Sequence, residues 1–190
     1  PSGAGCPYSA VSSPVYPAAP AAALKLLREQ GYDAVNLKQL AGELGCSTQP
    51  VYLSFSGMEE LRGELIPLAV AEFERYMKAG SEDGVVCLYG MRYIAFAKEE
   101  PRLFRFLFMR PNAFAEIRQA LLAMIERSIE KLMGTYHIGH EEADILHDQL
   151  WMHAHGIAAM VATDFCDWNM EKVERMLAAC KRAFTEKYKA

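Results

Sequence analysis

Residues 36–55 read NLKQLAGELGCSTQPVYLSF, and this stretch decides the fold of the N-terminal part of the chain. Asn36 precedes an apolar helical repeat, and Gln39 follows it by three positions, which is the spacing of a capping box at a helix start. Gly45 permits a tight turn, and Ser47 is a natural N-cap for a second helix. The stretch therefore predicts two short helices joined by a three-residue turn.

This arrangement fits the major groove of DNA, where the second helix presents its first residues to base edges. We expect residues 48–50 to read bases, because the side chain of Gln49 can pair with adenine through two hydrogen bonds. Tyr52 and Ser54 are better placed for phosphate oxygens, as is Lys38 at the anion-favouring start of the preceding helix. The predicted DNA-binding residues are Asn36, Lys38, Thr48, Gln49, Pro50, Tyr52 and Ser54.

About forty residues around this motif resemble the TetR family of regulators. The matching residues are Ala22-Ala23-Leu24, Leu26-Leu27, Gly31, Leu40-Ala41, Leu44-Gly45, Ser47, Val51-Tyr52, Phe55 and Glu59-Glu60-Leu61. Met58 stands where the family usually has Lys. Residues 21–61 hold three basic and five acidic side chains, a net of 3 − 5 = −2. We therefore expect few phosphate ion pairs and a shallow salt dependence of DNA binding.

Helical patterns dominate the rest of the chain, and no run of alternating apolar residues indicates a strand. The fold class is therefore predicted as all-α, with about nine helices. Their expected ranges are 18–30, 37–44, a short helix after Ser47, 58–80 with a kink at Pro67, 82–98, a helix opened by Pro101, 111–134, 141–163 and 170–189. We expect a disordered leader at 1–17, a helix-turn-helix DNA-binding domain at 18–63, and a helical effector-binding and dimerisation domain at 64–190.

Composition narrows the class of protein. The net charge of −4 argues against nonspecific coating of nucleic acid, and five scattered cysteines suit free thiols in the cytoplasm. No apolar run is long enough for a membrane span, and the first twenty residues do not resemble a signal peptide. Because no nucleophile elbow, phosphate loop or HExxH motif is present, we expect no enzyme activity and no cofactor.

The C-terminal part resembles a TetR subgroup named for a Trp-His-Gly signature, here Trp151, His155 and Gly156. This resemblance implies a small-molecule effector pocket, but aromatic residues at helical spacing equally suit core packing with one satisfied histidine hydrogen bond. The expected wall residues are Tyr93, Phe104, Phe108, Met124, Trp151 and His155. His140, Asp144, His147, Asp148, Trp151 and His155 follow one another at three- or four-residue steps, but one straight helix rarely supplies a tetrahedral site. We therefore predict no metal.

The last two helices carry apolar residues at helical spacing. In the TetR family such helices pair with their symmetry mates, which implies a homodimer with two recognition helices on a pseudo-palindromic operator. The expected interface residues are Leu150, Ile157, Val161, Val173, Leu177 and Phe184. The favoured function is a repressor that a small-molecule effector releases from double-stranded DNA. The alternative is a helical ligand- or partner-binding protein with weak or lost DNA binding.

Overall fold

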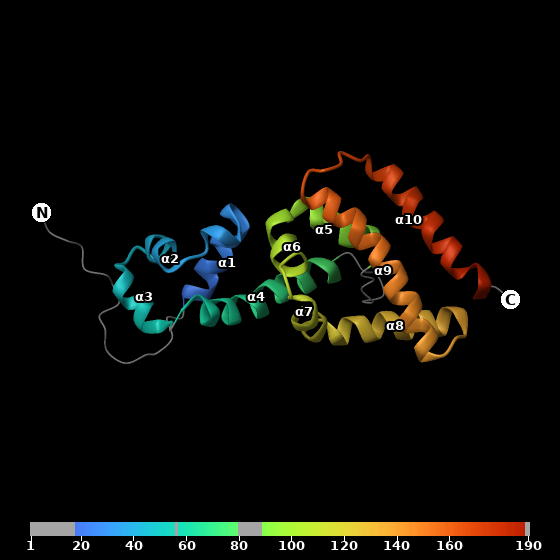
Figure 1. The fold of residues 1–190 in the computed structure, drawn as a ribbon, viewed down its shortest axis with the longest axis horizontal. Coiled ribbons are helices and arrows are strands. Elements are labelled where there is room, and N and C mark those ends of the chain that lie inside the picture. The colour runs from blue at the N-terminus through green and yellow to red at the C-terminus, as the bar shows by residue number, and fades with distance from the viewer. Residues whose placement is uncertain (1–17, 56, 80–88, 189–190) are drawn as a thin grey trace, which may run out of the picture. The chain divides into compact units, whose positions relative to one another are not determined.

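A computed structural model describes residues 18–55, 57–79 and 89–188, and within these ranges the chain is all-α with no strand (Figure 1). The described residues form ten α-helices and two short 3-10 helices. The helices are α1 (Ala19–Gln30), η1 (Tyr32–Ala34), α2 (Leu37–Glu43), α3 (Thr48–Ser54), α4 (Met58–Lys78), α5 (Met91–Glu99), α6 (Pro101–Phe108), α7 (Phe114–Ala120), α8 (Leu122–Tyr136), α9 (His140–Ala162), α10 (Met170–Thr185) and η2 (Glu186–Tyr188).

The chain divides into two compact units, one ending at Ala71 and the other beginning at Glu72. The division falls inside α4, which continues through Pro67 as a single helix. The leader expected at 1–17 lies outside the described residues.

The N-terminal unit is built around apolar side chains from its four helices. In α1–α3 they recur at the spacing that the sequence predicts, so each helix turns one face inward. Fully or almost fully buried are Ala23, Leu26 and Leu27 of α1, Leu40 and Ala41 of α2, Val51 of α3, and Leu61 and Leu65 of α4. This small core holds α2 and α3 in a fixed arrangement and leaves their opposite faces to solvent.

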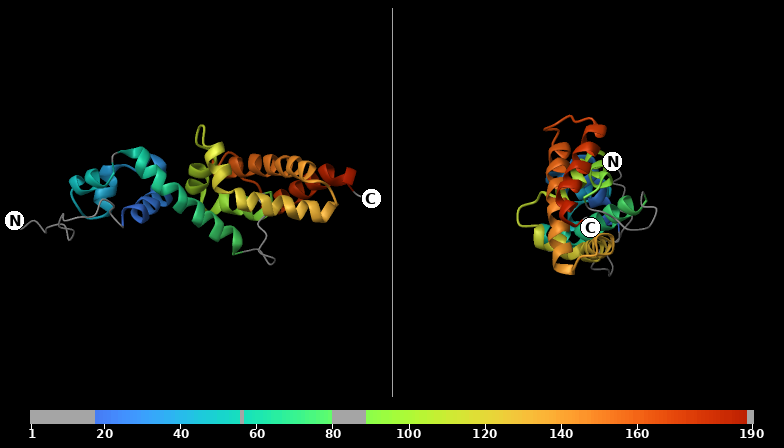
Figure 2. Two further views of the ribbon diagram at one scale, coloured as in Figure 1. Left: turned by 90° about the horizontal axis from the view of Figure 1, so that it is seen from below. Right: turned by 90° about the vertical axis from the view of Figure 1, so that its right-hand side faces the viewer.

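Helix α9 is the central element of the C-terminal unit and packs against α5, α6, α8 and α10. Two further views show α8 and α10 lying along it (Figure 2). Aromatic rings fill the space at one end of the unit. The Phe73 ring lies 4.9 Å from that of Phe96 and 5.1 Å from that of Phe108, and the Tyr93 ring lies 5.5 Å from that of Phe104, measured between centroids. Such ring pairs each stabilise the core beyond simple area burial.

Two predicted helices begin or end elsewhere in the structure. The helix predicted at 82–98 begins only at Met91, because Tyr89 and Gly90 are not helical, and residues 82–88 lie outside the described part. The helix predicted at 111–134 is wrong as a single element. Asn112 has a φ of 58°, a conformation that an asparagine tolerates but a helix does not, so α7 starts at Phe114. A break at Leu121 then separates α7 from α8.

Candidate functional site

Asn36 fixes the start of α2. Its Oδ1 accepts a hydrogen bond from the backbone N–H of Gln39 at 2.9 Å, and its Nδ2 donates to the Ala34 carbonyl at 3.3 Å. The first bond satisfies one of the backbone donors that a helix start leaves without a partner. The predicted capping role of Asn36 is therefore confirmed.

The turn between α2 and α3 depends on Gly45. Its φ of +66° lies in the left-handed region, which a glycine adopts without steric cost. The backbone N–H of Cys46 bonds the Ala41 carbonyl at 3.0 Å, and that of Gly45 bonds the Gly42 carbonyl at 3.1 Å, which is the Schellman pattern of a helix end. Ser47 is the N-cap of α3, as predicted, in the extended conformation, and its side chain makes no capping hydrogen bond.

Helix α3 has one buried and one exposed face. Val51 is completely buried and Phe55, just after the helix, is 3% exposed, as the sequence predicts. Tyr52 and Leu53 are 61% and 73% exposed. Thr48 and Gln49 are exposed as well, and Pro50 is half-buried. The side chain of Ser54 lies outside the described part of the structure. The outer face of α3 therefore combines polar groups at its start with large apolar surface one turn on.

Leu53 also belongs to this face, although it is not among the DNA-binding residues predicted from the sequence. At 73% exposure it is more exposed than any other large apolar residue that the structure describes in the N-terminal unit. Leucine on an otherwise polar recognition face offers apolar contact to a thymine methyl group or to a sugar. The signal in the sequence was its position four residues after Gln49, on the same helix face.

Positive charge on the N-terminal unit is partly neutralised by carboxylates of the same unit. Lys25 on α1 forms an ion pair with Glu43 on α2, and hydrogen bonding to Glu43 raises the pKa of Lys25 above its ordinary value. Arg62 pairs with Glu59 at 2.6 Å. Lys38 is exposed near the start of α2 and has no ion-pair partner among the described residues. The unit therefore offers DNA few cations.

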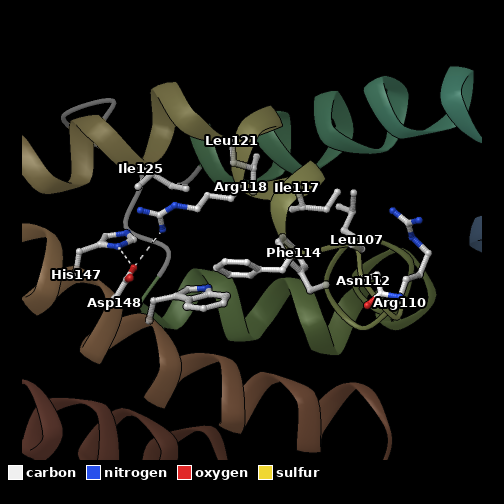
Figure 3. Close-up of a pocket in the computed structure, with 13 residues that line it drawn as sticks. Leu107, Arg110, Asn112, Phe114, Ile117, Arg118, Leu121, Ile125, His147 and Asp148 are labelled. Carbon is white, nitrogen blue, oxygen red and sulfur yellow. Dashed lines mark hydrogen bonds and ion pairs between the residues drawn. The ribbon is translucent and has the colours of Figure 1, made fainter.

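The C-terminal unit contains a cavity of about 140 Å³ between α6, α7, α8 and α9. Its walls are mostly apolar, with Leu107, Phe114 and Ile117 among them (Figure 3). Of the six wall residues expected from the sequence, Phe108 and Trp151 line it. The other four, Tyr93, Phe104, Met124 and His155, do not line it.

Tyr93, Phe104 and His155 instead form a buried network beside the cavity. The Tyr93 hydroxyl lies 3.0 Å from His155 Nδ1, and the Phe104 ring stacks on the His155 ring at 5.8 Å between centroids. Burial lowers the pKa of His155 and raises that of Tyr93, so both groups are neutral and the hydroxyl donates to the imidazole. His155 is therefore a core histidine whose Nδ1 has a hydrogen-bond partner.

Charged groups gather at one end of the cavity. Arg118 lies 3.4 Å from Asp148 and 3.3 Å from Asp144, and His147 Nδ1 lies 3.3 Å from Asp148 Oδ1. His140 contacts Glu126 at 3.1 Å. Among the described residues no cluster of three or more His, Cys, Asp or Glu has the arrangement of a metal site. Asp144 and Asp148 thus pair with Arg118, and His140 and His147 each contact a carboxylate.

The two last helices bury part of their apolar surface within the unit itself. Of the residues expected at a dimer interface, Leu150, Ile157 and Val173 are at most 4% exposed, and Val161, Leu177 and Phe184 are half-buried. Ile145 and Met152 of α9, by contrast, are 51% and 58% exposed. They are seven positions apart, two helical turns, and so share one outer face of α9.

The fold and the α2–α3 geometry define the class of this protein as a helix-turn-helix DNA-binding protein. Residues 21–65 match the family model described as bacterial regulatory proteins, tetR family. The N-terminal unit therefore carries a helix-turn-helix domain similar to those of this family of DNA-binding regulators. No curated protein matches it. No helix in the described ranges has both the length and the apolar character needed to cross a membrane.

Proposed function

We propose that this protein is a homodimeric cytoplasmic repressor that a small-molecule effector releases from a pseudo-palindromic operator. The observation that carries the proposal is the exposed face of α3, where Thr48 and Gln49 precede Tyr52 and Leu53 on a helix whose opposite side is buried. A recognition helix needs such a face, since its first turns enter the major groove while its inner side anchors it to the domain.

The residues of this face divide by the chemistry of their side chains. Gln49 reads a base edge, with adenine as the preferred partner, and Thr48 and Leu53 contribute hydroxyl and apolar contacts. Tyr52 donates its hydroxyl to a phosphate, and Lys38 near the start of α2 supplies a cation. Asn36 caps α2 and thereby positions it. Its side chain does not contact DNA, whereas the backbone groups that it orders at the start of α2 do. We propose no enzyme activity for the protein.

The dimer is proposed to form on the outer face of α9 that Ile145 and Met152 occupy. Gly156 lies four residues after Met152, on the same face, and a Cβ at this position would meet no atom within 4 Å in its own chain. A glycine whose space is open within the protomer allows the partner helix to approach closely. The half-buried Val161, Leu177 and Phe184 border the interface, whereas Leu150, Ile157 and Val173 are buried within each protomer.

The effector is proposed to occupy the cavity between α6, α7, α8 and α9. Its largely apolar wall with a few convergent polar groups is typical of small-molecule sites. A ligand that binds one arrangement of these helices better than another shifts the spacing of the two recognition helices in the dimer, which couples the cavity to DNA.

A mobility-shift titration against the promoter beside the protein's own gene tests the DNA-binding half of this proposal. Wild-type protein is expected to shift this promoter, and Gln49→Ala and Tyr52→Ala are expected to weaken the shift. Gln30→Ala, which changes an exposed residue at the end of α1, serves as the matched control. Absence of any shift at low salt would contradict the proposal.

The alternative function is a helical ligand- or partner-binding protein with weak or lost DNA binding. The ion pairs of Lys25 and Arg62 favour it, because they withdraw cations from the surface that phosphates would contact. Unchanged binding of the Gln49→Ala and Tyr52→Ala variants to every DNA tested would support this alternative.

A further inference from the structure

The cavity between α6, α7, α8 and α9 is lined mainly by apolar side chains that are shielded from solvent. Its aliphatic wall residues are each at most 5% exposed, and they are Leu107, Ala113, Ile117, Leu121 and Ile125. An apolar molecule that enters such a space removes its own surface from water, which is the main favourable contribution to binding between apolar groups. The wall therefore selects a ligand with an apolar body.

Aromatic rings complete the wall and favour a ligand that is itself a ring. Phe108, Phe114 and Trp151 line the cavity, and the ring centroids of Phe114 and Trp151 lie 5.9 Å apart with the planes at 40°. The volume of about 140 Å³ is close to the roughly 150 Å³ of an apolar protein cavity that accommodates benzene. Phe114 is 59% exposed and Asn112 is exposed as well, so the cavity opens to solvent beside these wall residues. A single ring therefore both fits the space and can enter it.

The charged side chains of the wall are paired within the protein. Figure 3 shows Arg118 and Asp148 at one end of the cavity and Arg110 at the other. Arg118 lies 3.4 Å from Asp148 and 3.3 Å from Asp144, and Arg110 lies 3.0 Å from Glu116. A charged ligand would have to disturb one of these pairs or give up water without gaining a new partner, and both cost free energy. A neutral ligand is therefore favoured.

His147, the remaining titratable residue of the wall, offers a ligand no free ring nitrogen. Its side chain is 2% exposed and its Nε2 is buried, so a molecule in the cavity does not reach this atom. Its Nδ1 lies 3.3 Å from Asp148 Oδ1. Affinity for a ligand in this cavity must therefore come from contact with the apolar wall rather than from a hydrogen bond to this histidine.

We propose that the cavity binds a neutral, apolar molecule of about one aromatic ring, held by contact with the rings and aliphatic side chains of the wall. The binding site stands on the cavity itself, and only its meaning as the effector site rests on the proposed function. Toluene represents this class of ligand. Benzoate and protonated benzylamine place a negative and a positive charge on a body of similar shape.

Calorimetric titration of the full chain, without DNA, with these three compounds tests the class of ligand. Wild-type protein is expected to bind toluene about tenfold or more tightly than either ion, because the charged group of an ion loses hydration near the apolar wall.

Two variants change the volume of the cavity in opposite directions. Ala113 precedes α7 with a φ of −80° and a ψ of −11°, a conformation open to any L-residue, so Ala113→Leu adds volume to the wall without backbone strain. It is expected to weaken toluene binding about tenfold or more, because the added side chain competes with the ligand for space.

Leu121→Ala enlarges the cavity and is expected to shift the preference from toluene toward naphthalene. Leu132→Ala is the matched control, since Leu132 is 3% exposed, like Leu121, but does not line the cavity. It is expected to leave the ratio of the toluene and naphthalene affinities unchanged. An equal change of this ratio in both leucine variants would place the bound ligand outside this cavity and contradict the proposal.

Three further results would overturn the proposal: no binding of toluene up to the limit of its solubility, binding of benzoate or benzylamine as tight as that of toluene, or wild-type affinity for toluene in Ala113→Leu. Titrating toluene into the complex with the operator separates the site from its regulatory role. Toluene binding that leaves the affinity for the operator unchanged supports the site and contradicts the effector role. Absent toluene binding in a protein that still shifts its operator contradicts the site and leaves DNA recognition supported.

Discussion

The small number of available cations predicts an unusually weak dependence of DNA binding on salt. Lys25 and Arg62 are held by carboxylates, whereas Lys38 is exposed without an ion-pair partner among the described residues. Each phosphate neutralised on duplex DNA contributes about −0.9 to the slope of log affinity against log salt. A dimer that uses one Lys38 per half-site therefore has a slope of about −1.8.

This slope corresponds to a roughly 12-fold loss of affinity between 50 and 200 mM salt, against about 10³ to 10⁵ for proteins with six to ten phosphate contacts. Fluorescence anisotropy on a labelled operator, repeated across this salt range, measures it. Lys38→Gln is expected to bring the slope close to zero. Met58→Lys, at the first residue of α4, is expected to steepen it by about 1.8 in the dimer.

Gln49→Ala is the matched control for these two variants, because it removes a neutral base contact. It is expected to weaken binding at every salt concentration and to leave the slope unchanged. A wild-type slope steeper than about −5, or a Lys38→Gln slope equal to that of the wild type, would show that more cations than Lys38 contact phosphates.

Three more predictions concern stability and assembly. Asn36→Ala removes the cap of α2 and is expected to lower the free energy of unfolding by about 1 kcal/mol in urea denaturation. Met152→Lys is expected to convert the dimer into monomers in light scattering, whereas Leu122→Lys, also exposed but on α8, is not. Burial lowers the pKa of His147 and His155 below the ordinary 6.5, so the unfolded chain binds more protons below that pH. Stability is therefore complete above about pH 6.5 and falls as the pH drops further, and equal unfolding midpoints at pH 7.5 and 5.5 would contradict this.

The α2–α3 motif was predictable in detail because its structure depends on short-range interactions. The cap of Asn36 joins residues three apart, and the left-handed conformation of Gly45 follows from the absence of a side chain. The burial of Val51 and Phe55 follows from helical spacing alone. Ser47 takes the predicted N-cap position of α3 without a side-chain hydrogen bond, since a residue type favours such a bond without ensuring it.

The cavity was only partly predictable, because its wall comes from segments distant in the sequence. Phe108 and Trp151 were expected there, but the pattern also suited Tyr93 and His155, which pack together in the core. The sequence pattern indicated His147 only as a possible metal ligand. Its position on the cavity wall depends on how α9 is rotated against α7 and α8, which no local pattern specifies.

An all-α chain with a helix-turn-helix near residues 36–55 follows from local sequence, because caps, turn glycines and apolar spacing act within a few residues. How the apolar residues of α9 divide between buried and exposed positions depends on tertiary packing. This helix is apolar on more than one side, so its sequence is compatible with several orientations. Packing against α5, α8 and α10 buries Leu150 and Ile157, leaves Met152 exposed, and turns His147 toward the cavity.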